Sequence, residues 1–174
     1  MRHHGVRRNP GAGALFRINA ADYGVDKILG HLTISNGLAW TGDGAIAYYV
    51  DTPTGRIDVF DYDSTNGLTG RRPFVTIDAA EGFPDGLTVD VDGGVWVALW
   101  NGHAVRHYDS SGTLVEIIDV PPGQVTACTF GGSDLTDLFI TTSATGAAQR
   151  SPGAGALFHH KVGVPGIPVR PFNG

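Results

Sequence analysis

The 174-residue chain predicts an all-β fold, and three observations support that prediction. Short apolar runs of strand length recur throughout, with 26 glycines and 10 prolines dispersed between them. Helical 3.6-residue periodicity with capping residues is not evident anywhere. Similar units of four short strands repeat along the chain at roughly 40 to 50 residues, which is the size of one β-propeller blade.

Two of these units align along their whole length. The first begins at Asn36 and the second at Asp85, 49 residues further on (85 − 36), and in each the opening residue precedes Gly-Leu and an apolar run. A third, weaker unit begins at Thr126. The strand-like runs expected within the units are residues 45–50, 56–61, 95–100, 104–109 and 138–142.

The start of the chain does not make a whole unit. Residues 11–19 match residues 153–161, the outer half of the third unit, so the chain opens midway through a blade. We therefore expect residues 11–174 to form a partial propeller of about three and a half blades, whereas closed propellers have about four to eight. N-terminal blades would be missing, and the open edge at 11–18 would favour self-association. Residues 1–10 are expected to form a disordered basic tail.

Composition and charge narrow the classes of partner and compartment. A net charge of −5 gives no reason to expect nucleic acid or an anionic membrane as a partner. The basic start lacks the apolar core of a signal peptide, and no apolar stretch reaches membrane-spanning length. Cys128 is the single cysteine, which excludes an internal disulfide and favours a reducing compartment, so we expect a cytoplasmic protein.

The dipeptides Asn36-Gly37 and Asp85-Gly86 are open to two interpretations. Asn-Gly and Asp-Gly are strong hairpin-turn signals. However, both stand at the same place in a repeat, where both side chains would face one central channel. Carboxylate and amide oxygens suit a hard cation such as Ca²⁺, Mg²⁺ or Mn²⁺. Asn36 and Asp85 are therefore either two turn residues or two ligands of one site.

Other polar and aromatic residues are less specific signals. Asp51, at the end of a strand, would either line the channel mouth or support a turn. Trp100, in the matching place of the second unit, would either form a wall for a sugar-like ring or pack in the core. His159 and His160 are adjacent on a predicted strand and face opposite sides, so they do not share an ion. Cys128 lies in an apolar run and is expected to be buried.

Several motifs together resemble one known family. They are Ile34-Ser-Asn-Gly-Leu-Ala-Trp, Phe60-Asp-Tyr-Asp, Pro84-Asp-Gly-Leu, Val95-Trp-Val-Ala, Thr126-Ala-Cys-Thr-Phe-Gly-Gly and the closing Val162-Gly-Val-Pro-Gly-Ile-Pro. In order and spacing they resemble the gluconolactonase, regucalcin and senescence marker protein family. The resemblance implies a six-bladed propeller with one divalent cation in its channel. It also implies that Asn36 and Asp85 are metal ligands, whereas the family's early glutamate ligand and early substrate-binding groups have no counterpart here.

The expected activity is metal-dependent hydrolysis of a small-molecule, sugar-type lactone. The cation would be Ca²⁺, Mg²⁺, Mn²⁺ or Zn²⁺, with Ca²⁺ favoured, and it would polarise the lactone carbonyl and activate water. Asp85 is also the expected general base, because the Asn36 amide cannot accept a proton from water. The alternatives are a non-catalytic calcium-binding or interaction propeller and an inactive truncated fragment.

Overall fold

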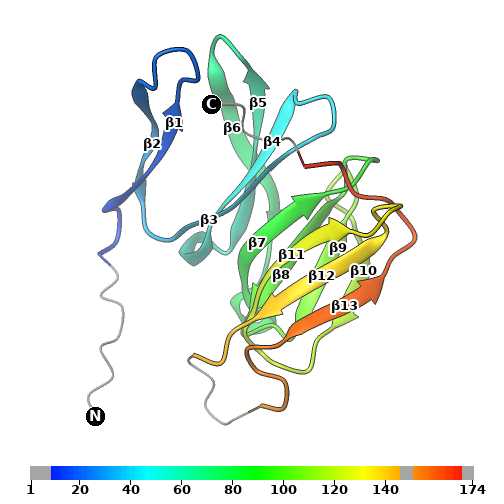
Figure 1. Ribbon diagram of the computed structural model, residues 1–174. Helices are drawn as coiled ribbons and strands as arrows, with labels where there is room; N and C mark the ends of the chain where they lie inside the picture. The colour runs from blue at the N-terminus through cyan, green and yellow to red at the C-terminus, as the bar shows by residue number, and fades with distance from the viewer. Residues whose placement is uncertain (1–8, 146–150, 170–174) are drawn as a thin grey trace.

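The computed structural model describes residues 9–145 and 151–169, and these residues are all-β apart from two single-turn 3₁₀ helices (Figure 1). The 3₁₀ helices span Thr52–Thr54 and Ala79–Glu81. The strands are β1 (Gly13–Ile18), β2 (Val25–Leu32), β3 (Ser35–Trp40), β4 (Ile46–Asp51), β5 (Arg56–Asp63), β6 (Gly67–Thr76), β7 (Phe83–Val89), β8 (Val95–Trp100), β9 (Ala104–Tyr108), β10 (Leu114–Asp119), β11 (Val125–Gly131), β12 (Asp137–Thr142) and β13 (Leu157–Lys161).

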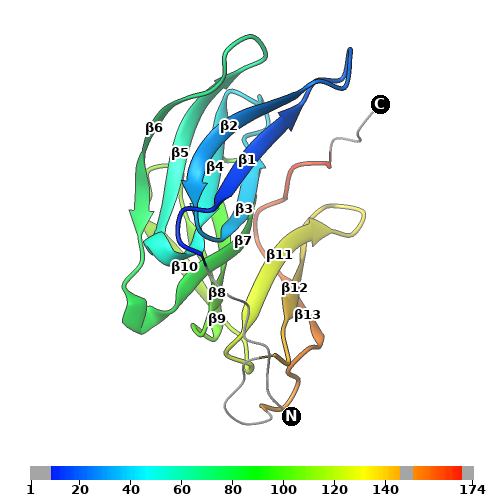
Figure 2. The same ribbon diagram turned by 90° about the vertical axis from the view of Figure 1, so that its left-hand side faces the viewer.

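Each sheet is built from strands that are consecutive in sequence and antiparallel. The sheets β3–β6 and β7–β10 have four strands, β11–β13 has three, and β1–β2 has two. The sheets follow one another in space as they do in sequence, face against face (Figure 2). Their first strands β3, β7 and β11 lie beside one another, since β7 contacts both β3 and β11. This is a propeller-like arrangement, and the all-β prediction is confirmed.

Hydrophobic cores fill the spaces between successive sheets. One core joins β3–β6 to β7–β10, a second joins β7–β10 to β11–β13, and a third lies between β1–β2 and β3–β6. The strand β8 explains why the middle sheet is apolar on both faces. Val95, Val97 and Leu99 enter the first core, whereas Trp96 and Ala98 enter the second. Because alternate side chains point to opposite faces, a strand between two cores must be continuously apolar.

The two dipeptides that resemble hairpin turns lie inside strands. Asn36-Gly37 is in β3 and Asp85-Gly86 is in β7, and none of these four residues has a positive φ. The register shifts between Ser35 and Leu38 in β3, and between Pro84 and Leu87 in β7, which marks a bulge at each dipeptide. The hairpin-turn interpretation is therefore wrong, because the sheet ladder runs through both positions.

Gly37 is required by the close approach of β3 to β7. A Cβ atom at Gly37 would lie 2.7 Å from the carbonyl oxygen of Asp85 and 2.8 Å from the backbone nitrogen of Leu87. Neither backbone atom can move without displacing β7. We predict that Gly37→Ala lowers the free energy of unfolding by about 1–3 kcal/mol, measured by urea denaturation. Gly163→Ala is the control, because nothing lies within 4 Å of its Cβ position. Equal stability of the two variants would contradict this account.

The predicted strands agree with the structure at most positions. The run 95–100 is β8 at the expected bounds, and the others differ from β4, β5, β9 and β12 by one or two residues at an end. Residues 1–8 of the expected tail lie outside the described part of the chain. Within the described ranges, no helix has the length and apolar character needed to cross a membrane.

Candidate functional site

A pocket of about 350 Å³ lies where β3 and β7 begin. It brings together Asn36 and Asp85, the two residues that the repeat places at equivalent positions. Its lining residues are Ile34, Asn36, Thr52, Pro53, Phe83, Asp85, Trp100 and Asn101. The bulges in β3 and β7 fall at Asn36 and Asp85, and a bulge re-aims a side chain that would otherwise follow the strand alternation.

Two neighbours fix the orientation of the Asn36 amide. Its Nδ2 donates a hydrogen bond of 3.0 Å to the hydroxyl of Thr52. The Asn36 side chain also hydrogen-bonds to the Asp85 carboxyl group. Because these bonds use the two N–H groups of the amide, the carbonyl oxygen Oδ1 is left as a free acceptor among the described residues. The Asn36 amide and the Asp85 carboxyl group thus contact each other through the NH₂ group, and a cation bound by both oxygens would replace this contact.

Burial decides the protonation behaviour of Asp85. Desolvation raises the pKa of this carboxyl group above its usual value, and hydrogen bonds from Asn36 and the backbone N–H of Gly86 offset part of the increase. A carboxyl group with a raised pKa is a stronger base than an exposed one. A raised pKa is therefore compatible with the general-base role expected for Asp85.

The sequence predicted that Asp51 and Trp100 occupy matching places in the two units, but the structure shows that they do not. Ser35 and Pro84 are equivalent in the repeat, and Ser35 pairs with Asp51 whereas Pro84 pairs with Leu99. The residue that matches Trp100 is therefore Thr52, one position further along. Since neighbouring strand residues face opposite ways, this shift of one residue puts Trp100 on the pocket wall and leaves Asp51 off it.

Asp51 instead holds a backbone turn. Its side chain is only 5% exposed, and its carboxylate accepts hydrogen bonds from the backbone N–H groups of Thr33 and Ile34, at 2.7 Å in the case of Ile34. These two residues connect β2 to β3. The geometry therefore favours the supporting role for Asp51 over a place at the channel mouth, and no contact with substrate is proposed for it.

The donors in this pocket fit a hard cation but do not complete its coordination. Asn36 and Asp85 each offer an oxygen, and the Thr52 hydroxyl adds a third oxygen on the same wall. Ca²⁺ takes about six to eight oxygen ligands, so water or other groups would supply the rest. Within the described residues, no three His, Cys, Asp or Glu side chains come together as a metal site. His159, for example, pairs with Asp137 at 2.8 Å.

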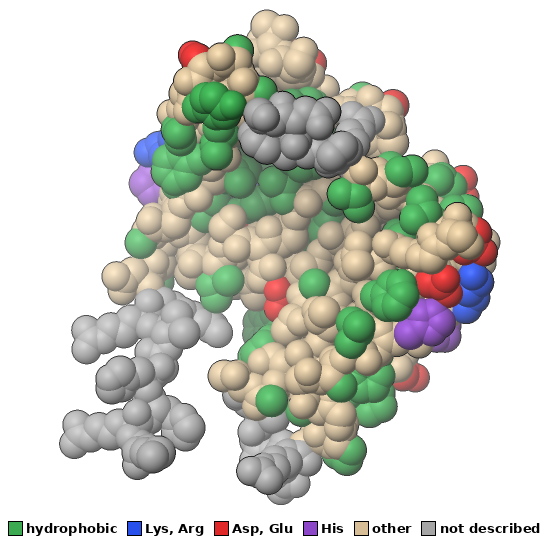
Figure 3. All heavy atoms as spheres, in the orientation of Figure 1, with side chains coloured by type: hydrophobic (Ala, Val, Ile, Leu, Met, Phe, Trp, Pro, Cys, Tyr) green, Lys and Arg blue, Asp and Glu red, His purple; other side chains and the backbone are tan. Residues whose placement is uncertain are grey.

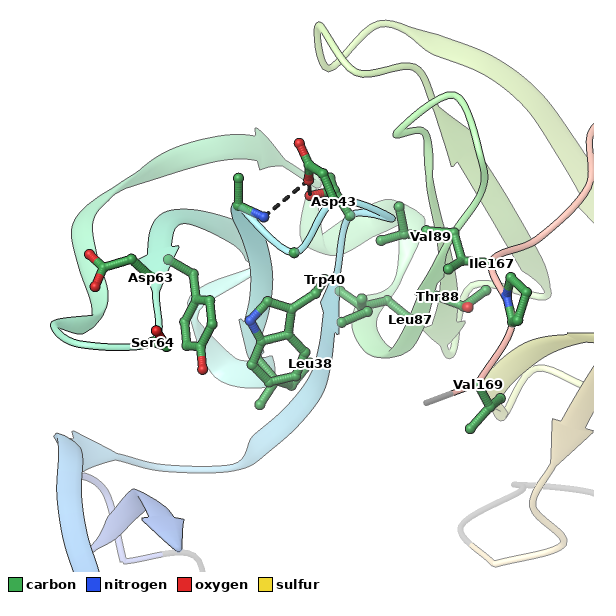
Figure 4. A pocket seen from close by; sticks show the side chains of 16 residues that line it. Leu38, Trp40, Asp43, Asp63, Ser64, Leu87, Thr88, Val89, Ile167 and Val169 are labelled. Atoms are coloured by element: carbon green, nitrogen blue, oxygen red, sulfur yellow. Dashed lines mark hydrogen bonds between the residues drawn. The ribbon is translucent and has the colours of Figure 1, made fainter. Parts of the chain in front are cut away.

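A larger pocket of about 750 Å³ lies at the opposite ends of β3 and β7 (Figure 4). Its carboxylates come from Asp43 and Asp63, each of which accepts backbone hydrogen bonds within its own turn, from Ala45 and from Thr65 and Asn66 respectively. Both carboxylates therefore stabilise turns. Size therefore does not identify the site, and we assign the candidate chemistry to the smaller pocket, which holds the paired Asn36 and Asp85.

Cys128 is buried and takes no part in the pocket. Burial raises the pKa of its thiol to about 12, and the thiol donates to the backbone oxygen of Trp96. We predict that a disulfide reagent at pH 8 does not label the native protein and labels one thiol per chain in denaturant, because only the thiolate reacts. Rapid labelling of the native protein, followed by absorbance, would show that Cys128 is accessible.

Sequence reasoning missed three polar residues near the site. Thr52, Asn101 and Gln124 belong to connecting segments. Thr52 meets Asn36, and Gln124 meets Trp100 and Asn101, only in the folded chain. The one available signal was that Thr52 and Asn101 directly follow the second strand of their units, which are β4 and β8. Gln124, 23 residues from its partner Asn101, gave no local signal.

Comparison with known proteins identifies the family. Residues 1–144 match the family model described as the SMP-30/Gluconolactonase/LRE-like region, and the chain belongs to this family. Regucalcin of Bos taurus is 36% identical over 160 residues, which cover 88% of this chain. The solved structure of a calcium-binding regucalcin from Agrobacterium tumefaciens is 28% identical and covers 91% of this chain, with a TM-score of 0.83. A gluconolactonase from Xanthomonas campestris is 31% identical and covers 73%, with a TM-score of 0.62.

The chain spans about half the length of the relatives that it matches. The matched part is 54% of the bovine regucalcin, 55% of the Agrobacterium chain and 40% of the Xanthomonas chain. Asn36 and Asp85 both lie within the family match.

Proposed function

We propose that this chain contributes to the metal-dependent hydrolysis of sugar-type lactones, with Asn36 and Asp85 as ligands of one divalent cation. The observation that supports this most directly is the meeting of the two side chains at bulges on neighbouring strands, in one pocket. Family membership supports the reaction class. The donors are hard oxygens, which suit Ca²⁺, Mg²⁺ and Mn²⁺ better than Zn²⁺, and Ca²⁺ is favoured because a similar solved structure is that of a calcium-binding regucalcin.

A bound cation would polarise the lactone carbonyl and lower the pKa of water. Asp85 accepts a proton from the attacking water while the water oxygen bonds to the carbonyl carbon. The ring C–O bond then breaks, the ring oxygen takes the proton from Asp85, and the product is a hydroxy acid. Asn36 would bind the cation through its amide oxygen, and the Trp100 ring would form an apolar wall beside the substrate.

We also propose that the four sheets are consecutive blades of a six-bladed propeller and that residues 11–174 belong to it. The antiparallel order of the strands and the cores between sheets support this. The two ligands are then part of a coordination shell that other groups complete. A cytoplasmic location stays a prediction from the single cysteine.

A non-catalytic cation-binding propeller is the rival function, with an inactive fragment as the limiting case. Both are separated from the lactonase proposal by hydrolysis of D-glucono-1,5-lactone, followed by acid release in a pH-stat. We expect hydrolysis to be faster than the spontaneous rate. Chelator should abolish this additional hydrolysis, and added Ca²⁺ should restore it. Cation binding without hydrolysis would favour the binding module, and neither binding nor hydrolysis would favour the inactive fragment.

The β1 edge supports a proposal of self-association between two copies of this chain. Among the described strands, β1 pairs with β2 alone, and Phe16 and Ile18 on it are 56% and 58% exposed. Hydrophobic side chains also gather on this side of the molecule (Figure 3). Long, exposed apolar edges favour strand pairing between chains. Sedimentation velocity should show a concentration-dependent dimer, and a monomer at all concentrations would reject the proposal.

A further inference from the structure

Asn101 lies on the wall of the candidate site in an uncommon backbone conformation. It directly follows β8 and lines the same pocket as Asp85 and Asn36. Its φ is 62°, in the left-handed region, which few residues other than glycine adopt, although asparagine tolerates it best. A held, uncommon conformation at a pocket invites a functional explanation.

The loop that carries Asn101 is tightly held. Trp100 forms an isolated β-bridge with Gln124, and the backbone N–H of Gly102 donates to Leu99 at 3.0 Å. On the other side, a Cβ at Gly82 would lie 2.7 Å from the Cα of Gly102, so the backbones are in close contact. Asn101 is therefore presented to the pocket by a fixed loop.

Gln124 orients the Asn101 amide. Its side chain is only 7% exposed, and its Nε2 donates a hydrogen bond of 2.9 Å to Oδ1 of Asn101. The backbone of Gln124 is held in turn, because its oxygen accepts from the N–H of Ser143 at 2.9 Å. A buried glutamine is costly unless it is hydrogen-bonded, so this contact determines which end of the Asn101 amide is left for the pocket.

The free end of the Asn101 amide is its donor end. Oδ1 is occupied by Gln124, and the NH₂ group has no partner among the described residues. The pocket wall thus offers an acceptor from Asn36, a carboxylate from Asp85 and a donor from Asn101. This polar set lies beside the apolar surface of Trp100 and Phe83.

We infer that Asn101 is a substrate-binding residue that donates a hydrogen bond to a hydroxyl oxygen on the sugar ring of the lactone, and that Gln124 is its positioning residue. This inference rests on the proposed lactone hydrolysis at the same pocket. A site built to hydrogen-bond an oxygen discriminates against a ligand that lacks it, because the protein donor is then left unpaired. Asn101 would therefore determine specificity without touching the cation.

Two variants test the donor without disturbing the backbone. Asn101→Gly suits the left-handed φ and removes the amide. Gln124→Glu replaces the buried donor by a carboxylate, which draws the Asn101 NH₂ group away from the pocket. Each should raise KM for D-glucono-1,5-lactone about 5- to 10-fold, the loss of one hydrogen bond, and leave the Kd for Ca²⁺ unchanged. Tyr23→Gly is the control, because Tyr23 has a similar φ of 56°, is exposed and does not line the pocket.

A binding measurement separates failure of this inference from failure of the proposed function. The probe is 1,5-anhydro-D-glucitol, a sugar ring without the lactone carbonyl, titrated while the ¹⁵N side-chain resonances of Asn101 are followed. We expect saturable shifts, with weaker binding in Gln124→Glu. Chemical shift changes without any hydrolysis of the lactone would reject the proposed lactonase function but would still support sugar binding by Asn101. Hydrolysis with an unchanged KM in Asn101→Gly, or absence of the shifts, would overturn the assignment.

Discussion

Replacing Asp90 with alanine is expected to lower the free energy of unfolding by about 3–5 kcal/mol, as for loss of a buried ionic partner. The Asp90 side chain lies in the turn between β7 and β8 and is buried at 1% exposure. Its carboxylate accepts from Trp96 Nε1 at 2.9 Å and the backbone N–H of Gly94 at 2.7 Å, and it contacts His107 Nε2 at 2.9 Å. Alanine would leave these buried donors unpaired and the stacked rings of Trp96 and His107 unsupported.

The control for this variant is Asp92→Ala, an exposed position in the same turn, where the change should stay within about 0.5 kcal/mol. Burial acts to raise the pKa of Asp90, but the hydrogen bonds from His107, Trp96 and Gly94 outweigh it and hold the pKa below its usual value. A depressed folded pKa stabilises the protein above the unfolded pKa of about 3.9. The difference between wild type and Asp90→Ala in urea denaturation should therefore narrow as pH falls below about 4. A similar loss in both variants, or no dependence on acid, would contradict this account.

Replacing Asp85 with asparagine is expected to reduce kcat for lactone hydrolysis by about 10²- to 10⁴-fold, the usual contribution of a general base. The amide cannot accept the proton of water, and loss of the charge would also weaken the proposed cation binding. The same variant should unfold at a slightly higher temperature without cation. Burial disfavours the charged Asp85 carboxylate and raises its pKa, and the neutral amide does not carry this cost. Activity falls while stability rises, which distinguishes a functional residue from a structural one.

The control for Asp85→Asn is Asp119→Asn, the same chemical change at an exposed position at the end of β10. It should keep wild-type kcat, cation affinity and melting temperature. Initial rates over a range of Ca²⁺ concentrations separate lost base catalysis from lost cation binding. Full turnover by Asp85→Asn at saturating Ca²⁺ would rule out Asp85 as the base.

The strands and the site pair could be predicted because their signals are local and repeated. The run at residues 95–100 is apolar at every position, which is what a strand between two cores requires, and it became β8. Asn36 and Asp85 were found together through their equivalent positions in the repeat, and one pocket contains both. Periodicity shows which residues are equivalent without any knowledge of the fold's exact geometry.

The remaining features depend on register and on contacts between distant segments. The bulges at Asn36 and Asp85 could not be distinguished from hairpin turns, because both use Asn-Gly and Asp-Gly. The sequence alignment of the two units matched Trp100 to Asp51 and was wrong by one residue. Such a shift matters because it moves a side chain to the other face of the sheet. The pairing of Asn101 with Gln124 joins two loops and has no sequence signature.

Paramagnetic broadening by Mn²⁺ tests most directly whether Asn36 and Asp85 hold one cation. Mn²⁺ prefers the same oxygen donors and reports even weak binding in ¹⁵N NMR spectra. We predict that broadening at low Mn²⁺ centres on the amides of Asn36, Asp85 and Thr52, that Ca²⁺ reverses it, and that Asp85→Asn removes it. Broadening that centres instead on exposed carboxylates such as Asp134, or that persists unchanged in Asp85→Asn, would contradict the proposed cation site.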